Sequence, residues 1–150
     1  MAERFDPIGL KLTRTARRVS RAFDAALAEA GGTLPLWLVL IALKRNQHTN
    51  QRDLAESIGI EGATLTHHLH RMEEDGLIVR RRAPDNRRVQ LVELSESGEQ
   101  VFRKLLARVR EFDRQLRAGL SEADLASLRA LLERLEHNVE SATDSENGGT

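Results

Sequence analysis

The alternation of apolar and polar residues predicts helices over most of this chain. Apolar residues recur at spacings of three and four in residues 6–30, and again twice within residues 96–140, which is the pattern of long amphipathic helices. Residues 36–44 are apolar nearly all round, so we expect a helix there that is buried on most sides. Residues 141–150 show no such period and contain two glycines, so we expect a disordered tail.

Two short helices joined by a tight turn are predicted between the long ones. Thr49 or Asn50 can cap the first of them, and Gly59 can end it because glycine tolerates a positive φ. The second runs from Glu61 to about Met72. Two short helices with a glycine-containing turn between them form a helix-turn-helix unit.

The second short helix has a polar face suited to reading DNA. Leu65, Leu69 and Met72 share one face, and at about 100° per residue the polar side chains point away from it. The first turns of a recognition helix enter the major groove most deeply, where threonine can contact a base edge and arginine a guanine or a phosphate. The residues predicted to contact DNA are Thr64, Thr66, His67, His70 and Arg71.

A basic hairpin follows this helix. Residues 78–82 and 87–94 read as two strands, and the intervening Ala-Pro-Asp-Asn sequence suits a turn. Between Ile78 and Gln90 there are five arginines and one aspartate, a net charge of +4. Arg87 at the tip can enter the minor groove, and we expect Asp85 to hold Arg87 in position through a bidentate pair.

The composition narrows the class of protein further. The chain has 23 basic and 23 acidic residues and a net charge of zero, so its basic footprint is local to the hairpin. It has no cysteine, which excludes disulfides, thiol redox sensing and cysteine-based zinc sites. The N-terminus has no apolar signal core and no apolar run approaches about 18 residues, so we expect a cytoplasmic protein with no membrane partner.

The long helices at both ends carry apolar stripes with little local partner surface. We expect them to pack against the same helices of a second copy, because a two-fold homodimer is the commonest such arrangement. Such a dimer also places two recognition helices one turn of DNA apart. The predicted architecture is a single domain over residues 1–140, with a DNA-binding lobe at about 34–95 and dimerisation helices at about 6–30 and 96–140.

Two features of the sequence leave alternatives open. The polar face of the first helix carries several arginines, among them Arg14 and Arg17, which are either solvated or paired with an anionic ligand or a phosphate. Trp37, the one tryptophan, either belongs to the core or lines a ligand cavity, since indole suits stacking on flat ligands.

Metal sensing and catalysis are the competing functions. A zinc-responsive DNA-binding regulator would use His48, His67, His68 and His70, but helix geometry points His67 and His70 outward and His68 to the flank. The four do not converge, so we predict no metal site and no cofactor. The sequence has no nucleotide-binding glycine loop, nucleophile motif or metal-hydrolase spacing, so we predict no enzymatic activity.

The whole pattern resembles the MarR family of winged helix-turn-helix regulators. The resemblance is carried by residues 51–55, residues 64–73, the junction at 75–78, the Asp-Asn-Arg tip at 85–87, and the following Leu-Ser with glycine three residues later. It implies a mainly α fold with a small β-hairpin wing, flanked by N- and C-terminal dimerisation helices.

The resemblance also implies a function. Members of the family are homodimers that repress by occupying a palindromic operator on double-stranded DNA. Many release it when a small phenolic or aromatic carboxylate binds between the DNA-binding lobe and the dimerisation helices. On this chain the candidate contacts for such a ligand are Arg14, Arg17 and Trp37.

Overall fold

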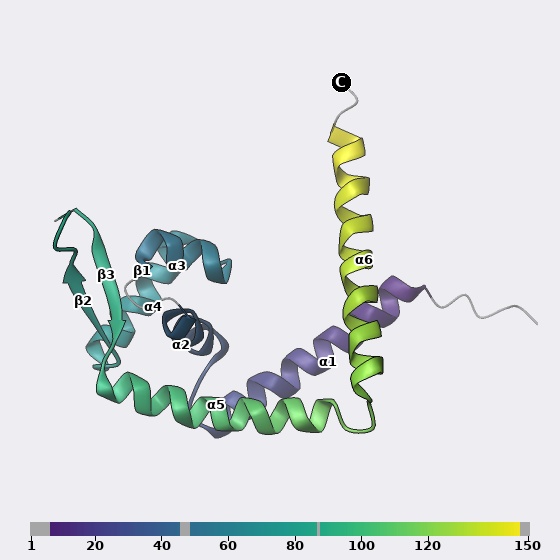
Figure 1. Ribbon diagram of the computed structural model, residues 1–150, viewed down its shortest axis with the longest axis horizontal. Helices are drawn as coiled ribbons and strands as arrows, with labels where there is room; N and C mark the ends of the chain where they lie inside the picture. The colour runs from purple at the N-terminus through teal and green to yellow at the C-terminus, as the bar shows by residue number, and fades with distance from the viewer. Residues whose placement is uncertain (1–6, 46–48, 87, 148–150) are drawn as a thin grey trace, which may run out of the picture. The chain divides into compact units, whose positions relative to one another are not determined.

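The computed structural model describes residues 7–45, 49–86 and 88–147, with the side chains of these residues, except that of Thr49, as far as residue 142. Within these ranges the chain forms six helices and three short strands (Figure 1). They divide into two units, Met1–Phe112 and Asp113–Thr150. The elements are α1 (Ile8–Glu29), α2 (Leu34–Arg45), β1 (Thr49–Asn50), α3 (Gln51–Ile58), α4 (Gly62–Glu74), β2 (Ile78–Arg82), β3 (Gln90–Leu94), α5 (Glu96–Leu116) and α6 (Glu122–Asn147).

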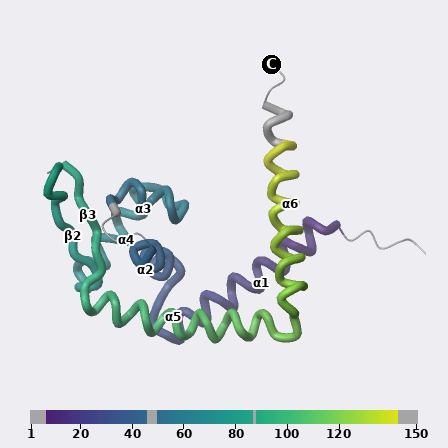
Figure 2. The backbone as a smooth tube through the Cα atoms, in the orientation of Figure 1, coloured from purple at the N-terminus to yellow at the C-terminus, as the bar shows by residue number. Residues whose placement is uncertain are grey.

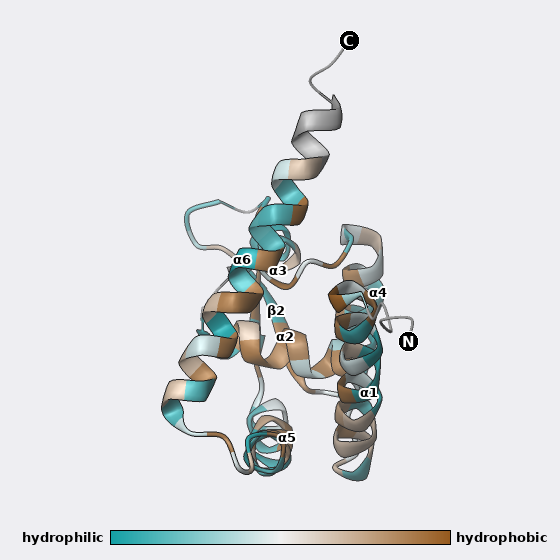
Figure 3. Ribbon diagram, turned by 90° about the vertical axis from the view of Figure 1, so that its right-hand side faces the viewer, coloured by the Kyte–Doolittle hydropathy of each residue, from teal (hydrophilic) through white to brown (hydrophobic). Residues whose placement is uncertain are grey.

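The core of the first unit forms around α2, which is hydrophobic along most of its length (Figure 3). Val39 and Leu40 on α2 are fully buried, as are Leu54 on α3 and Leu65 and Leu69 on α4. The expectation of a helix buried on most sides is therefore confirmed for α2. The close packing of α2, α3 and α4 around these side chains fixes the direction in which α4 presents its polar face.

The helix-turn-helix unit is formed as predicted, and its path can be followed in the backbone tube of Figure 2. Asn50 caps α3, because its side-chain oxygen accepts a hydrogen bond of 2.9 Å from the backbone N–H of Asp53. Gly59 ends the helix in the left-handed conformation, with φ 67°. The cap and the left-handed glycine together fix the turn that leads into α4.

The wing is an antiparallel hairpin of β2 and β3, paired from Ile78 with Leu94 to Arg82 with Gln90. The second strand is shorter than predicted, since it begins at Gln90 and not at residue 87. One strand was not predicted: β1 pairs with the other edge of β3, which gives the strand order β1-β3-β2. With only two residues, β1 is too short to show an alternating pattern in the sequence.

A small hydrogen-bonded junction connects the wing to α5 and explains the Leu-Ser-x-x-Gly sequence. The hydroxyl of Ser95 donates to the carbonyl of Gly76 at 2.5 Å and accepts from the N–H of Gly98 at 3.0 Å. The N–H of Ser95 also donates to the carbonyl of Leu77 at 3.0 Å. A Cβ atom on Gly98 would overlap that carbonyl oxygen, so the position requires glycine. Ser95 therefore caps the start of α5, and Ser97 lies within its first turn.

Aromatic and ionic contacts attach α5 to the rest of the first unit. Trp37 on α2 is stacked on Phe102 of α5, with ring centroids 5.7 Å apart and planes at 4°. Lys44 donates to both carboxylate oxygens of Glu99 at 3.0 and 3.1 Å. These contacts join the N-terminal half of α5 to the same core as α2.

The first helix packs against α5 further along the chain. The rings of Phe23 and Phe112 lie 5.3 Å apart, and Arg108 reaches Glu29 at 2.8 Å. Pro7 is the N-cap of α1, so the first residue of the helix is Ile8.

The second unit is dominated by α6, whose start is capped by Ser121. The N–H of Asp124 donates to the hydroxyl of Ser121 at 3.1 Å, and that hydroxyl donates to the carboxylate of Asp124 at 2.7 Å. The carboxylate of Asp124 also accepts from the backbone N–H of Ser121 at 2.8 Å, and the two bonds that it accepts from Ser121, first the side-chain one and then the backbone one, lower the pKa of Asp124. The helix continues to Asn147, so the predicted tail at 141–150 is corrected: residues 141–147 contain no proline or glycine to end it.

In the part of the chain that the structure describes, no single helix is long and apolar enough to cross a membrane. Taken together, α1 and α2 have the length and composition of a membrane-spanning segment, but the two helices are bent at 79° to each other.

Candidate nucleic-acid interface

The polar face of α4 is exposed as predicted, whereas its apolar face is buried. Leu65, Leu69 and Met72 are at most 4% exposed and form the inner face. The five α4 residues predicted to contact DNA are all exposed on the rest of the helix: Thr64, Thr66, His67, His70 and Arg71. Their accessibility agrees with a DNA-reading role, and the contacts themselves stay a prediction.

Thr66 is partly engaged within the protein. Its hydroxyl donates to the carbonyl of Gly62 at 2.8 Å and accepts from the side-chain amide of Gln51 at 2.5 Å. A hydroxyl has one donor and two acceptor sites, so one acceptor site and the methyl group remain for a base. Gln51 is a residue of this surface that the sequence analysis missed, since nothing in its spacing shows that α3 meets α4 there.

The histidines of α4 do not form a metal site among the described residues. No group of three or more histidine, aspartate and glutamate side chains is placed there to hold an ion. The rings of His67 and His68 are 5.9 Å apart, and His70 lies 3.3 Å from the carboxylate of Glu74. His48, the fourth member of the zinc alternative, lies outside the described residues. The geometry gives no support to the zinc alternative.

The arginines of the wing differ in what they face. Arg80 points inward: its side chain is 17% exposed, and its Nε lies 3.3 Å from a carboxylate oxygen of Glu73 on α4. Arg81 lies 3.7 Å from Glu93, while Arg82 and Arg88 are exposed. We predicted that all of these arginines form one basic surface. Arg80 instead joins the wing to α4 and is not part of the outer surface.

The tip of the wing lies partly outside the described residues. Asp85 is exposed, but Arg87 is not described, so the pair predicted between them is untested. A shallow hollow of about 450 Å³ lies beside the start of β3. Arg52 from α3 and Arg88 from the wing line it together with amide side chains, so two cations from different elements border one polar depression.

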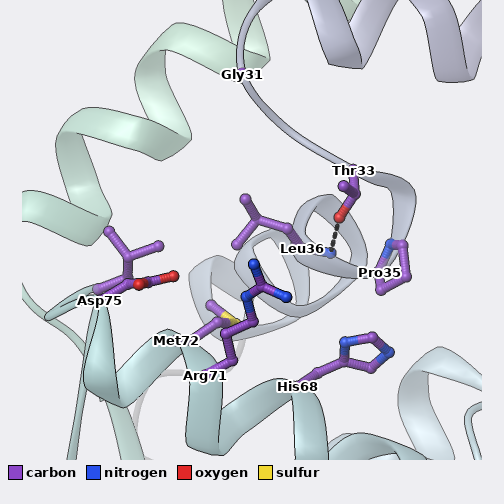
Figure 4. A pocket seen from close by; sticks show the side chains of 9 residues that line it. Gly31, Thr33, Pro35, Leu36, His68, Arg71, Met72 and Asp75 are labelled. Atoms are coloured by element: carbon purple, nitrogen blue, oxygen red, sulfur yellow. Dashed lines mark hydrogen bonds between the residues drawn. The ribbon is translucent and has the colours of Figure 1, made fainter.

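A second, more enclosed depression borders the C-terminal half of α4. It has a volume of about 510 Å³. One wall is the turn between α1 and α2 and the start of α2, and the other is the C-terminal half of α4 with the turn after it (Figure 4). Apolar side chains of Leu36, Met72 and Leu77 line it together with Arg71, His68 and Asp75. We name this depression the α2–α4 pocket.

The structure does not bring the three predicted ligand contacts to this pocket. Trp37 is 6% exposed and stacked on Phe102, so the core interpretation of its indole is the one that the structure supports. Arg14 and Arg17 are exposed on α1, and neither lines the pocket. Arg71, which was predicted to contact DNA alone, points into the pocket between His68 and Asp75 (Figure 4).

Comparison with known proteins places this arrangement in a family. A family model described as the MarR family matches residues 33–90, which covers α2 to the start of β3. A probable transcriptional regulator from Pseudomonas aeruginosa is 33% identical, with a TM-score of 0.74 over 87% of this chain and 97% of that one.

Two further relatives have been solved with bound molecules. The transcriptional repressor CouR, bound to a 23-mer DNA duplex, is 26% identical with a TM-score of 0.78, over 87% of this chain and 92% of that one. CouR from Rhodococcus jostii RHA1 has also been solved with p-coumaroyl-CoA, with a TM-score of 0.75. PcaV from Streptomyces coelicolor, in complex with its natural ligand, is 25% identical with a TM-score of 0.74, over 91% of this chain and 98% of that one.

Proposed function

The chain belongs to the MarR family of winged helix-turn-helix transcriptional regulators, and we propose that it is a homodimeric repressor released from DNA by a small aromatic or phenolic ligand. The predicted fold, helical with a small hairpin wing, is confirmed. The chain is therefore a DNA-binding transcriptional regulator and not an enzyme. The dimer, the repression and the ligand go further: the dimer and the ligand rest on observations given below, and repression rests on the similarity to the transcriptional repressor CouR.

The observation that carries the DNA-binding proposal is the exposed polar face of α4 beside the arginine-bearing wing. In our proposal α4 lies in the major groove, where Thr64 and His67 near its start meet base edges. The wing lies along the backbone, with Arg87 and its neighbour Asp85 at the minor groove. Arg52 and Arg88, which border one polar hollow, supply phosphate contacts.

The homodimer is proposed from apolar side chains that one chain leaves uncovered. Soluble monomers rarely expose contiguous apolar patches, yet both terminal helices carry large exposed apolar residues. We propose that residues 6–30 and 96–140 form the dimer and that residues 34–95 bind DNA. Two copies then occupy the two halves of a pseudo-palindromic operator. The exposed residues are Ile8, Leu10 and Leu12 on α1, and Leu128, Leu131 and Val139 on α6.

The ligand is proposed to bind in the α2–α4 pocket. Its apolar walls suit an aromatic ring, and Arg71 suits a carboxylate, since guanidinium pairs with carboxylate in a bidentate fashion. The relatives CouR and PcaV are described with p-coumaroyl-CoA and with a natural ligand respectively. This pocket replaces the predicted site at Arg14, Arg17 and Trp37 in our proposal.

Two measurements test the proposal. Selection of duplexes from a random library by the full chain should yield a site with two inverted halves, and binding should weaken steeply with salt. Melting temperatures should rise with one or more of benzoate, salicylate and hydroxybenzoate, and the same acid should weaken binding to the selected duplex. An enriched site without inverted halves contradicts the dimeric operator, and a flat melting screen contradicts the ligand.

A further inference from the structure

The position of Arg71 on α4 is unusual because it borders two surfaces at once. At about 100° per residue, Arg71 lies only about 40° around the helix from His67, the centre of the outward face. It lies about 60° from His68 on the other side, and His68 lines the α2–α4 pocket. Arg71 is therefore at the edge of the outward face, and its side chain reaches into the pocket (Figure 4).

The chemistry of the pocket makes Arg71 its main anion-binding group. Among the residues that line it, Arg71 is the one that carries a positive charge at every physiological pH. Asp75, one turn further along α4, lines the same pocket and repels anions placed near its end of the wall. An aromatic acid is therefore best accommodated with its ring against Leu36 and Met72 and its carboxylate on the guanidinium of Arg71.

We infer that ligand and DNA compete directly for Arg71. The inference rests on the proposed function, in which α4 enters DNA and an aromatic acid enters the pocket. A guanidinium held by a carboxylate in the pocket is withdrawn from the outward face of α4, and a guanidinium on a phosphate or base is withdrawn from the pocket. Release of DNA then needs no change in the distance between the two lobes of a dimer.

Direct competition has two consequences. Coupling is reciprocal, so DNA lowers the affinity for the acid by the same factor as the acid lowers the affinity for DNA. The negative charge of the ligand is also essential, because a neutral ring of similar size fills the pocket without holding the guanidinium. A mechanism in which the ligand changes the distance between the two DNA-binding lobes depends on the volume that the ligand fills in the pocket. Such a mechanism does not require the negative charge.

The absence of cysteine from the sequence allows a test that does not depend on knowing the natural ligand. Thr33 is exposed and lines the wall opposite α4, so a Thr33→Cys variant carries one thiol at the pocket. Dithiobis(nitrobenzoic acid) exchanges with this thiol, releases one thionitrobenzoate, and leaves an aromatic carboxylate tethered in the pocket. Dithiodipyridine leaves a ring of similar size without a carboxylate, and a reducing agent removes either label.

The readout is binding to a duplex that the unmodified chain has selected, measured by fluorescence anisotropy. We expect the nitrobenzoate label to weaken binding by about tenfold relative to unlabelled Thr33→Cys, within the usual range of coupling between sites. The pyridine label should change it by less than about twofold, and reduction should restore binding. Equal weakening by the two labels overturns the inference, because it shows that volume and not charge is sensed.

A second arm uses the arginine itself. In the double variant Thr33→Cys with Arg71→Ala, DNA binding is weaker at the outset and the two labels should act alike. Arg82→Ala is the matched control, since Arg82 is an exposed wing arginine outside the pocket. It should lower DNA affinity while the nitrobenzoate label keeps its full additional effect. A nitrobenzoate effect that survives Arg71→Ala overturns the inference.

The outcomes separate this inference from the proposed function. If the unmodified chain selects no duplex, the proposed operator binding fails together with the inference. If it selects a duplex but neither label weakens binding, the pocket is not coupled to DNA through Arg71, and the inference alone fails. Circular dichroism of each labelled form shows whether a loss of binding comes from unfolding.

Discussion

The DNA-binding lobe and the helix α6 have the same kind of apolar stripe and use it differently. On α4 of the lobe, Leu65 and Leu69 are fully buried within a single chain. On α6, Leu131 is 59% exposed and Val139 is 68% exposed. An amphipathic pattern therefore predicts which face of a helix is apolar, but it does not tell whether the same chain covers that face.

This difference separates two tasks within one short protein. The lobe has a closed core around α2, so α4, the proposed recognition helix, is held in one direction without help from a partner. The terminal helices leave apolar surface to be covered, and in our proposal a second copy covers it. The predictions below test this contrast, from the largest expected effect to the smallest.

The largest effect is expected for Leu131→Glu on α6. If a second copy covers this side chain, the dimer interface gains two buried unpaired carboxylates, one from each chain, which costs several kcal/mol per ion. Sedimentation velocity should show a single chain, and affinity for the selected duplex should fall. Ala130→Glu adds the same charge at an exposed position on the opposite face of α6 and should remain dimeric. Dissociation by both variants contradicts the assignment of the interface.

A large effect on folding is expected for Leu65→Ala in the lobe. Leu65 is fully buried in the core, so the variant should lose about 2–5 kcal/mol of the free energy of unfolding through lost burial and a cavity. Urea unfolding followed by circular dichroism measures this loss. Leu65→Met keeps the volume and should lose less than about 1.5 kcal/mol. A small loss for Leu65→Ala would show that the lobe is not closed within one chain.

An intermediate effect is expected for Gly98→Ala at the junction between the wing and α5. Its methyl group would overlap the carbonyl oxygen of Leu77, so the backbone must shift, at a cost of about 1–3 kcal/mol. Gly62→Ala is the matched control, because a methyl group there meets nothing within 4 Å. Alanine in α4 should be neutral or stabilising by up to about 1 kcal/mol. Equal stability of the two variants would contradict the close approach at Gly98.

The smallest effect is expected for Ser121→Ala at the start of α6. The hydrogen bonds of Ser121 lower the pKa of Asp124, so the capped helix is stabilised above the unfolded pKa of that carboxyl and loses this contribution as the pH falls through the folded pKa. The variant should raise the pKa of Asp124 toward its ordinary value, measured by NMR titration. Ser127→Ala, in the second turn of the same helix, should leave the pKa unchanged. An unchanged pKa of Asp124 in Ser121→Ala would show that the hydrogen bonds of Ser121 do not lower it.

Much of the fold could be predicted from local patterns in the sequence. Asn50 and Gly59 act at the helix ends where their chemistry predicts, because caps depend on neighbours only a few residues away. The inner face of α4 was also correct, since helical periodicity fixes which side chains share a face. The end of α6 was missed because its last residues lack an apolar period, although nothing in them breaks a helix.

The features that depend on distant residues could not be predicted. The inward turn of Arg80 depends on Glu73 of a different element, and charge counting along the chain treats Arg80 like any other wing arginine. The burial of Trp37 depends on Phe102, which is 65 residues further along the sequence. The α2–α4 pocket is likewise formed by residues from two segments that are distant in the sequence. For this reason Arg71 was predicted only to contact DNA, although it also lines this pocket.

The most direct test of the contrast between the lobe and the terminal helices is the mass of the full chain alone and on its selected duplex. Light scattering of the free protein at micromolar concentration should give twice the 16.9 kDa of one chain, and the complex should contain two chains per duplex. A mass of 16.9 kDa with one chain per duplex would contradict the account, because the apolar faces of the terminal helices would then remain uncovered in the working protein.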